Sequence, residues 1–163
     1  EAQIIDDLNV SNASIADLTG ITSFTNLTFL NCNNNQIQSL NLSGLVLLTY
    51  FDCTNNPITS INASGLTNLF GCSVNCPSLI SLDLSYCSSL NAFSYSNGSL
   101  TNLNMTGCSD LQSFFLSFTQ VNALILENMP LLYSIECRHN NLTSVTITNT
   151  PFLHDLLLFW TSH

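Results

Sequence analysis

The chain has 163 residues, of which 45% are hydrophobic and only 7% are charged, and this length suits one domain with a continuous core. Ten acidic residues stand against one basic residue, Arg138, so the formal net charge is −9. Nucleic acid and anionic membranes are bound by clusters of Lys and Arg, which this sequence lacks. No apolar run approaches the roughly 18 residues of a membrane span. We therefore expect neither nucleic-acid binding nor membrane insertion.

The segment 1–26 predicts an atypical N-terminal unit. Leu8, Val10, Ile15 and Leu18 precede their apolar counterparts in the next unit with an offset of 22, whereas later units repeat with an offset of 21. An insertion or a cap within this segment would explain the difference. The start lacks the charged and apolar regions of a signal peptide, as a mature secreted domain or a cytosolic one would.

From Leu27 onward the sequence has a 21-residue period. One short unit cannot bury its own apolar face, so a repeat of this kind predicts a stack of equivalent coils over residues 27–158. The leading position of each unit should be structural, and its members are Leu27, Leu48, Leu69, Leu90, Leu111, Leu132 and Leu153.

Within each unit, the apolar steps predict two extended segments. The step of two from Leu30 to Cys32 is strand alternation, and each such strand should pair in parallel with the coils above and below. A second step of two, from Leu40 to Leu42, predicts another extended segment on the opposite side. No interval is long enough for a well-formed helix, so the fold class is a mainly β solenoid with few or no helices.

Two columns of the repeat carry turn residues. Asn35, Asn56 and Asn140 share one column, where an amide side chain can bond to the backbone groups that a turn leaves open. Pro77, Gly98 and Thr119 replace Asn in this column, so those turns must be satisfied in another way. A second column holds Gly44, Gly65 and Gly107, where a positive φ is expected.

The seven cysteines fall mostly at positions of the repeat. Cys32, Cys53 and Cys137 are separated by multiples of 21, as are Cys87 and Cys108, so we interpret them as free, buried packing residues. The role of Cys76 stays open. A metal site is the alternative, built from Cys72, Cys76, Cys87 and Cys108, although two of these already have a packing role.

The unit from Leu27 to Leu42, with the sequence LTFLNCNNNQIQSLNL, resembles the leucine-rich repeat family. More narrowly it is similar to the short 21-residue bacterial class found in surface and secreted proteins of Bacteroidetes, over about residues 8–158. The resemblance implies a right-handed solenoid whose strands line a concave face. It also implies a non-catalytic binding module outside the cell or on its surface.

The last unit ends without a polar cap. Leu156 and Leu158 continue the core columns, and the sequence stops at His163. An uncapped solenoid exposes an apolar edge with unpaired strand groups. We expect either a longer parent protein, with the C-terminal cap missing here, or self-association through this edge.

The sequence offers no catalytic constellation. It contains no zinc-protease helix, nucleophile elbow, phosphate loop or dinucleotide fingerprint. Asp52 and Glu136 share a repeat position but lie four coils apart, roughly 19 Å at the usual strand spacing, which is too far for a glycosidase pair. His139, His154 and His163 have no nucleophile at a telling spacing. We therefore expect no enzyme activity and no cofactor.

The outward residues of the predicted strands are the candidates for binding. Two middle coils carry small polar residues, and aromatic residues stand on both sides, so the surface should form a shallow trough between aromatic walls. Exposed aromatics anchor protein partners and stack on sugar rings. These aromatics could instead only stiffen the sheet. The candidate residues are Phe29, Asn31, Tyr50, Asp52, Phe115, Phe118, Glu136 and Arg138.

This sequence therefore predicts a single recognition domain, with protein–protein binding or adhesion as its role. Two alternatives stay open. The first is a module that binds a glycan, and the second is a structural spacer within a larger surface protein.

Overall fold

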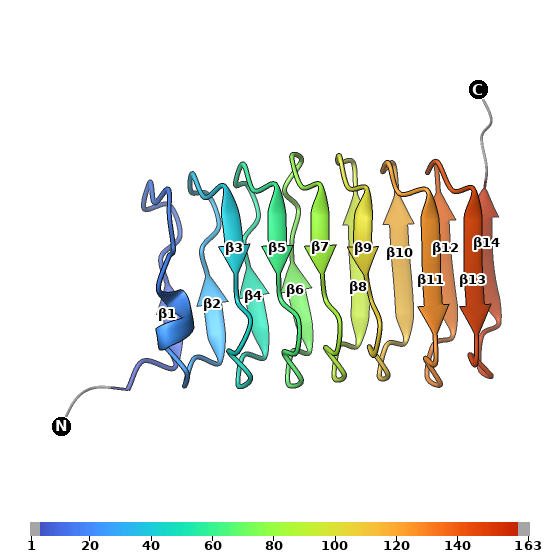
Figure 1. Cartoon of the computed structure of the whole chain (residues 1–163), viewed down its shortest axis with the longest axis horizontal. Helices are drawn as coiled ribbons and strands as arrows, with labels where there is room; N and C mark the ends of the chain where they lie inside the picture. Colours follow the sequence, from blue (N-terminus) through green and yellow to red (C-terminus); the bar gives the residue numbers. More distant parts are fainter. Residues whose placement is uncertain (1–3, 160–163) are drawn as a thin grey trace.

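The computed structural model describes residues 4–159 as a stack of coils with strands on two faces (Figure 1). The major face carries β1 (Asp7–Asn9), β2 (Phe29–Asn31), β4 (Tyr50–Asp52), β6 (Gly71–Ser73), β8 (Ala92–Ser96), β10 (Ser113–Ser117), β12 (Ser134–Arg138) and β14 (Asp155–Phe159). The minor face carries β3 (Ser39–Asn41), β5 (Ser60–Asn62), β7 (Ser81–Asp83), β9 (Asn102–Asn104), β11 (Ala123–Glu127) and β13 (Ser144–Thr148). Within the described residues the only helical element is a 3₁₀ turn, Ile21–Ser23. The predicted mainly β solenoid is confirmed.

All strand pairs are parallel, and their register follows the repeat. Phe29 pairs with Tyr50 and Ser113 pairs with Ser134, each with an offset of 21. Asp7 of β1 pairs with Phe29, an offset of 22. The one extra residue of the first unit is therefore absorbed outside the strand, and the side-chain alternation is kept.

The core is a set of columns that run through the stack. The leading leucines from Leu27 to Leu132 are fully buried, and Leu153 in the last coil is packed against the core. Burial of each such side chain contributes on the order of 2 kcal/mol. Among the described residues, no helix is long and apolar enough to cross a membrane.

The cysteine side chains are free thiols, and all but Cys72 are buried. Burial raises the pKa of the thiols of Cys32 and Cys137 to about 12 and that of Cys87 to about 11. A neutral thiol in an apolar column packs as a small hydrophobic group. The repeat cysteines therefore lie as buried, neutral thiols within the core columns.

The asparagine column closes the turn that follows each strand of the major face. The side chain of Asn56 donates to the carbonyls of Cys32 and Cys53, at 2.9 and 3.0 Å. Its oxygen accepts from the amide of Ile37 at 3.0 Å. One buried side chain thus satisfies three backbone groups on two coils, as the sequence predicted for this column.

Where asparagine is missing, other side chains take over. Cys76, next to Pro77, donates its Sγ–H to the carbonyl of Cys53. In the following coil the hydroxyl of Tyr95 donates to the carbonyl of Cys76 at 3.0 Å and fills the place of a side chain at Gly98. These two substitutes answer the open question about Cys76.

The glycine column adopts the left-handed backbone that the sequence predicted. Gly44, Gly65 and Gly107 have φ values of 89°, 74° and 80°. Tyr86 occupies the same column with φ 61°, and its ring lies against Gly107, where an added Cβ would come within 2.8 Å of it. Gly107 therefore has two roles: it adopts the positive φ of the turn, and its missing side chain leaves room for the Tyr86 ring.

The sheets are interrupted once on each face. The major face consists of two four-stranded sheets, β1-β2-β4-β6 and β8-β10-β12-β14, with no ladder between β6 and β8. The minor face breaks between β9 and β11. In Figure 1 both pairs of strands stand visibly farther apart than the paired neighbours. We call the β6–β8 interruption the seam.

Candidate binding surface

The N-terminal wall of the predicted trough is an aromatic stack. The rings of Phe29 and Tyr50 lie 5.7 Å apart and 13° from parallel. The Tyr50 ring continues over β6, where an added Cβ at Gly71 would be 3.5 Å from its Cδ2. Its hydroxyl bonds to the Oγ of Ser73 at 2.6 Å. Tyr50 therefore leans into the trough and is held there by β6.

The C-terminal wall is Phe115 on β10, a half-buried ring that points outward between Ser94 and Glu136. Behind it, Arg138 Nε lies 2.8 Å from Glu136 Oε1. The one cation of the chain is thus engaged by a neighbouring carboxylate. Phe115, Glu136 and Arg138 come together as the sequence reasoning expected of adjacent strands.

The floor of the trough coincides with the seam. Its outward residues are small, namely Gly71 and Ser73 on β6 and Ala92 and Ser94 on β8. Cys72 points inward from β6 yet is half-buried, whereas its column neighbours Leu30, Phe51, Phe93 and Phe114 are buried. Between the first and last coils, Cys72 is therefore the one residue of this column that is not fully covered.

Asn31 and Asp52 have their polar groups engaged within the sheet edge. Asn31 accepts from the amide of Asn33 at 3.1 Å. The carboxylate of Asp52 accepts from the amide of Thr54 and from the side chain of Asn33, both at 2.9 Å. The two bonds to the amides two residues on are typical Asx turns, and the Asn33–Asp52 bond joins neighbouring coils, so both side chains stabilise the sheet edge as well as facing outward.

Phe118 lies outside the strand, at the turn that follows β10. It has a left-handed backbone, φ 53°, in the column that holds asparagine at Asn34, Asn55 and Asn97. Its ring is 52% exposed and stacks on His139 at 4.4 Å and 15°. Sequence reasoning placed this ring in the wall of the trough; the structure places it at the rim, because the strand ends at Ser117.

The described residues contain no cluster of three or more His, Cys, Asp or Glu that could hold a metal ion. Three cysteines of the alternative metal site bond separately to the backbone, Cys76 to Cys53, Cys87 to Ala63 and Cys108 to Leu84. Each of these thiols satisfies a carbonyl of its neighbouring coil. The cysteines of that alternative are therefore spread along the core and do not converge on one point.

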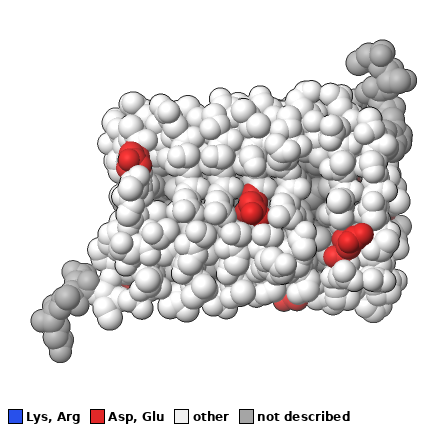
Figure 2. All heavy atoms as spheres, in the orientation of Figure 1, with Lys and Arg blue, Asp and Glu red and all other residues white. Residues whose placement is uncertain are grey.

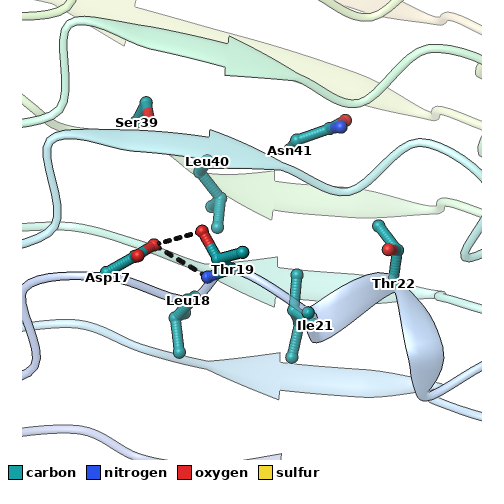
Figure 3. Close-up of a pocket in the computed structure, with 9 residues that line it drawn as sticks. Asp17, Leu18, Thr19, Ile21, Thr22, Ser39, Leu40 and Asn41 are labelled. Carbon is teal, nitrogen blue, oxygen red and sulfur yellow. Dashed lines mark hydrogen bonds between the residues drawn. The ribbon is translucent and has the colours of Figure 1, made fainter.

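The minor face has hollows of its own. One of about 250 Å³ lies between the first unit and β3, where Asp17 accepts from the amide and hydroxyl of Thr19 at 2.8 and 2.7 Å (Figure 3). These bonds lower the pKa of the Asp17 carboxyl. In Figure 2 this face is hollowed along its middle, its carboxylates stand apart from one another, and no basic side chain is in view. Isolated, locally bonded carboxylates form no converging site.

Comparison with known proteins agrees with this architecture. Residues 25–68 match the family model described as leucine rich repeats, in two copies. The strands keep the same 21-residue register beyond that segment, so the fold is a solenoid of the leucine-rich repeat type. Domains of this class commonly serve in protein–protein interaction and are typically non-catalytic.

One solved structure that the chain resembles is the functional domain of InlJ from Listeria monocytogenes, described as including a cysteine ladder. The two chains are 19% identical with a TM-score of 0.30, and the match covers 93% of this chain and 55% of that one. The chain thus spans about half the length of that structure. The search of curated proteins returned no match.

Proposed function

We propose that this domain recognises a protein partner through the trough on its major face. The carrying observation is the pair of aromatic walls, Tyr50 and Phe115, on either side of a floor of small side chains over the seam. Rigid aromatic anchors beside a small-residue surface are typical of binding hot spots. Adhesion, and a location outside the cell or on its surface, are parts of this proposal that rest on the resemblance to bacterial surface repeats.

A selection experiment tests the proposal and needs no identified partner. A random peptide library is selected for binding to the wild-type domain, and each binder is measured against Tyr50→Ser/Phe115→Ser. Serine already occupies both columns, at Ser113 and Ser94, so the variant should fold. The matched control is Ile125→Thr on the minor face, because Thr146 follows in that column.

We expect most binders to lose about tenfold or more in affinity, or about 1.4 kcal/mol, on the trough variant and to bind the control normally. Binders whose affinity is the same for the trough variant and for the wild type would refute the proposed surface.

Glycan binding is the second candidate, and Phe118 is the observation that favours it. The exposed ring of Phe118 stacks on His139, and Asn97, which is also exposed, precedes Phe118 in the same column. This surface combines an apolar ring face with hydrogen-bonding groups, as the binding of a sugar ring requires. Titration with oligosaccharides, followed by the NMR signals of the His139 ring, which stacks on Phe118 and is present in both proteins, distinguishes this candidate. The Phe118→Asn variant, which matches the column, should abolish any response.

A further inference from the structure

The minor face carries a groove that runs across its strands. Two hollows, of about 450 and 290 Å³, share Ser81 and Asp83 in their lining. The larger one also shares Ser39 and Asn41 with the hollow beside Asp17 (Figure 3). The three hollows therefore adjoin and form one groove, which extends from the first unit over β3, β5, β7 and β9 to the start of β11 (Figure 2). At a strand spacing of about 4.8 Å, its length is on the order of 25 Å.

One row of the groove lining consists of serine hydroxyls. Ser39, Ser60 and Ser81 pair in register, one from each coil. Within the described part of the chain, none of these three hydroxyls forms a hydrogen bond. By contrast, the hydroxyls of Ser43 and Ser64, just beyond the strands, each donate to an asparagine at 2.8 Å. The hydroxyls in the groove are therefore not needed by the fold and are available to a ligand.

The second row of the lining is a column of three asparagines and one aspartate, namely Asn41, Asn62, Asp83 and Asn104. In each of them a side-chain oxygen accepts from the amide two residues further on, at 2.9 to 3.2 Å. This bond fixes the orientation of the side chain. The δ-NH₂ groups of the three asparagines donate to no other residue of the described part of the chain. Each coil thus presents a fixed polar group with unused hydrogen-bonding capacity.

The charges along the groove disfavour an anionic ligand. Asp17 and Asp83 line it, and among the described residues no Lys or Arg does, on a chain of net charge −9. Such a field repels nucleic acid and acidic polymers. Sugar hydroxyls match the lining, because they accept from the asparagine amides and the serines and donate to the Asp83 carboxylate. The polar groups of the groove therefore favour a neutral ligand that is rich in hydroxyls.

The spacing along the groove separates a sugar chain from a peptide. The two rows present equivalent groups once per coil, at about 4.8 Å. An extended peptide advances by only about 3.3 Å per residue, so its successive residues would not meet equivalent groups. A β-1,4-linked hexose chain is extended, and each of its rings advances by close to one coil spacing. Successive sugars can therefore meet the same pair of rows in successive coils.

We propose that the minor-face groove binds an extended, neutral, linear glycan, which lies along the solenoid axis with about one sugar ring per coil. The site is on the opposite face from the trough and is separate from the ring of Phe118. The inference does not depend on the proposed function, and it adds a second class of ligand. Binding through many similar contacts, without an aromatic anchor, has one measurable consequence: affinity grows with the length of the chain.

The test titrates β-1,4-linked glucose oligomers, from cellobiose to cellohexaose, into isotope-labelled domain and follows the backbone amide shifts by NMR. Maltohexaose is the control ligand, because it has the same sugar and charge but a curved, α-1,4-linked chain. The triple variant Ser39→Ala/Ser60→Ala/Ser81→Ala removes the hydroxyl row. It should fold, because alanine already occupies this column at Ala123. Phe118→Asn is the control variant, and the peptides selected above are titrated in parallel.

We expect cellohexaose to shift the amides of β3, β5, β7 and β9 and to bind at least about tenfold more tightly than cellobiose. The triple variant should lose about tenfold or more in affinity, since three hydrogen bonds are removed, and Phe118→Asn should bind as wild type.

The proposal fails if no sugar gives a saturable response, if the response is confined to Phe118 and its neighbours, or if the triple variant folds and binds as wild type. Equal affinities for cellohexaose and cellobiose, or for cellohexaose and maltohexaose, would also overturn it. Groove shifts caused by the selected peptides but not by the sugars would show that the occupant is a peptide and not a glycan.

Discussion

At the scale of single residues, the sequence predicted the repeat and its turn columns but not the substitutes within them. Asn35, Asn56 and Asn140 bond as expected because one side chain and one turn recur in a fixed register. That Tyr95 would serve the carbonyl of Cys76 could not be predicted. It depends on the direction of a ring that starts in a different column and passes beneath a glycine.

The coupling between Tyr95 and Gly98 can be measured directly. Gly98→Asn alone should destabilise by about 2–3 kcal/mol through overpacking against the ring. Tyr95→Leu alone should cost about 2–4 kcal/mol, because it leaves a cavity and an unpaired carbonyl. The double variant should come within about 1 kcal/mol of wild type, giving a coupling of at least about 3 kcal/mol.

The free energies of unfolding of the wild type, the two single variants and the double variant, measured in urea, give the double-mutant cycle. Additive losses in the double variant would mean that the ring and the glycine do not share one space.

At the scale of the elements, the two strands per coil followed from the two apolar steps of two, and both are present. The seam did not follow from those steps, because Gly71–Ser73 and Ala92–Ser96 keep the same alternation as every other strand. In the sequence, this coil differs from the others only at Tyr95, Pro77 and Gly98, which are not the residue types usual in their columns. Tyr50 and Phe115 were candidate residues from the sequence, but the position of the Tyr50 ring over β6 depends on its contact with Ser73.

The buried thiols between the strands make the fold sensitive to alkali. The pKa of the Cys32, Cys108 and Cys137 thiols is raised to about 12 from an ordinary value of 9.0. Above pH 9 the unfolded chain loses these protons while the folded chain keeps them, so stability falls as pH rises. We expect the melting temperature, measured with a phosphine reductant, to be level from pH 7 to about 8.5 and to fall steeply toward pH 11.

Cys32→Val is the matched variant, since valine occupies the same column at Val74. Its melting temperature should fall less over the same range. An equal fall in both proteins would mean that the thiol at position 32 does not contribute.

At the scale of the whole molecule, the 21-residue period decides the architecture because each coil contacts its neighbours through the same columns. The leading leucines, the inward cysteines and the register of β2 with β4 all follow from it. The binding surface does not follow from the period, because it is built from positions where the columns differ. This is the physical reason why the repeating architecture could be predicted, whereas the interruptions of the sheets and the arrangement of the surface side chains could not.

Deleting one whole unit should therefore preserve the fold. Removing residues 48–68 joins equivalent positions and brings Phe29 to the place of Tyr50, over Gly71. We expect a cooperative thermal transition and an unchanged shape of the circular dichroism spectrum. Removing residues 51–70, one residue fewer, leaves the extra residue inside the strand, between Tyr50 and Gly71, and so turns its apolar residues outward; this control should not fold. Equal behaviour of the two deletions would contradict a strict 21-residue period.

The most direct test of the central claim, that partner recognition occurs in the trough of the major face, is a chemical-shift map. The tightest selected peptide is titrated into isotope-labelled domain, and backbone shifts are assigned to strands. We predict the largest changes at Tyr50, Ser73, Ser94 and Phe115, with little change on the minor face. Changes centred on β3, β5 and β7, with the trough unaffected, would contradict the account.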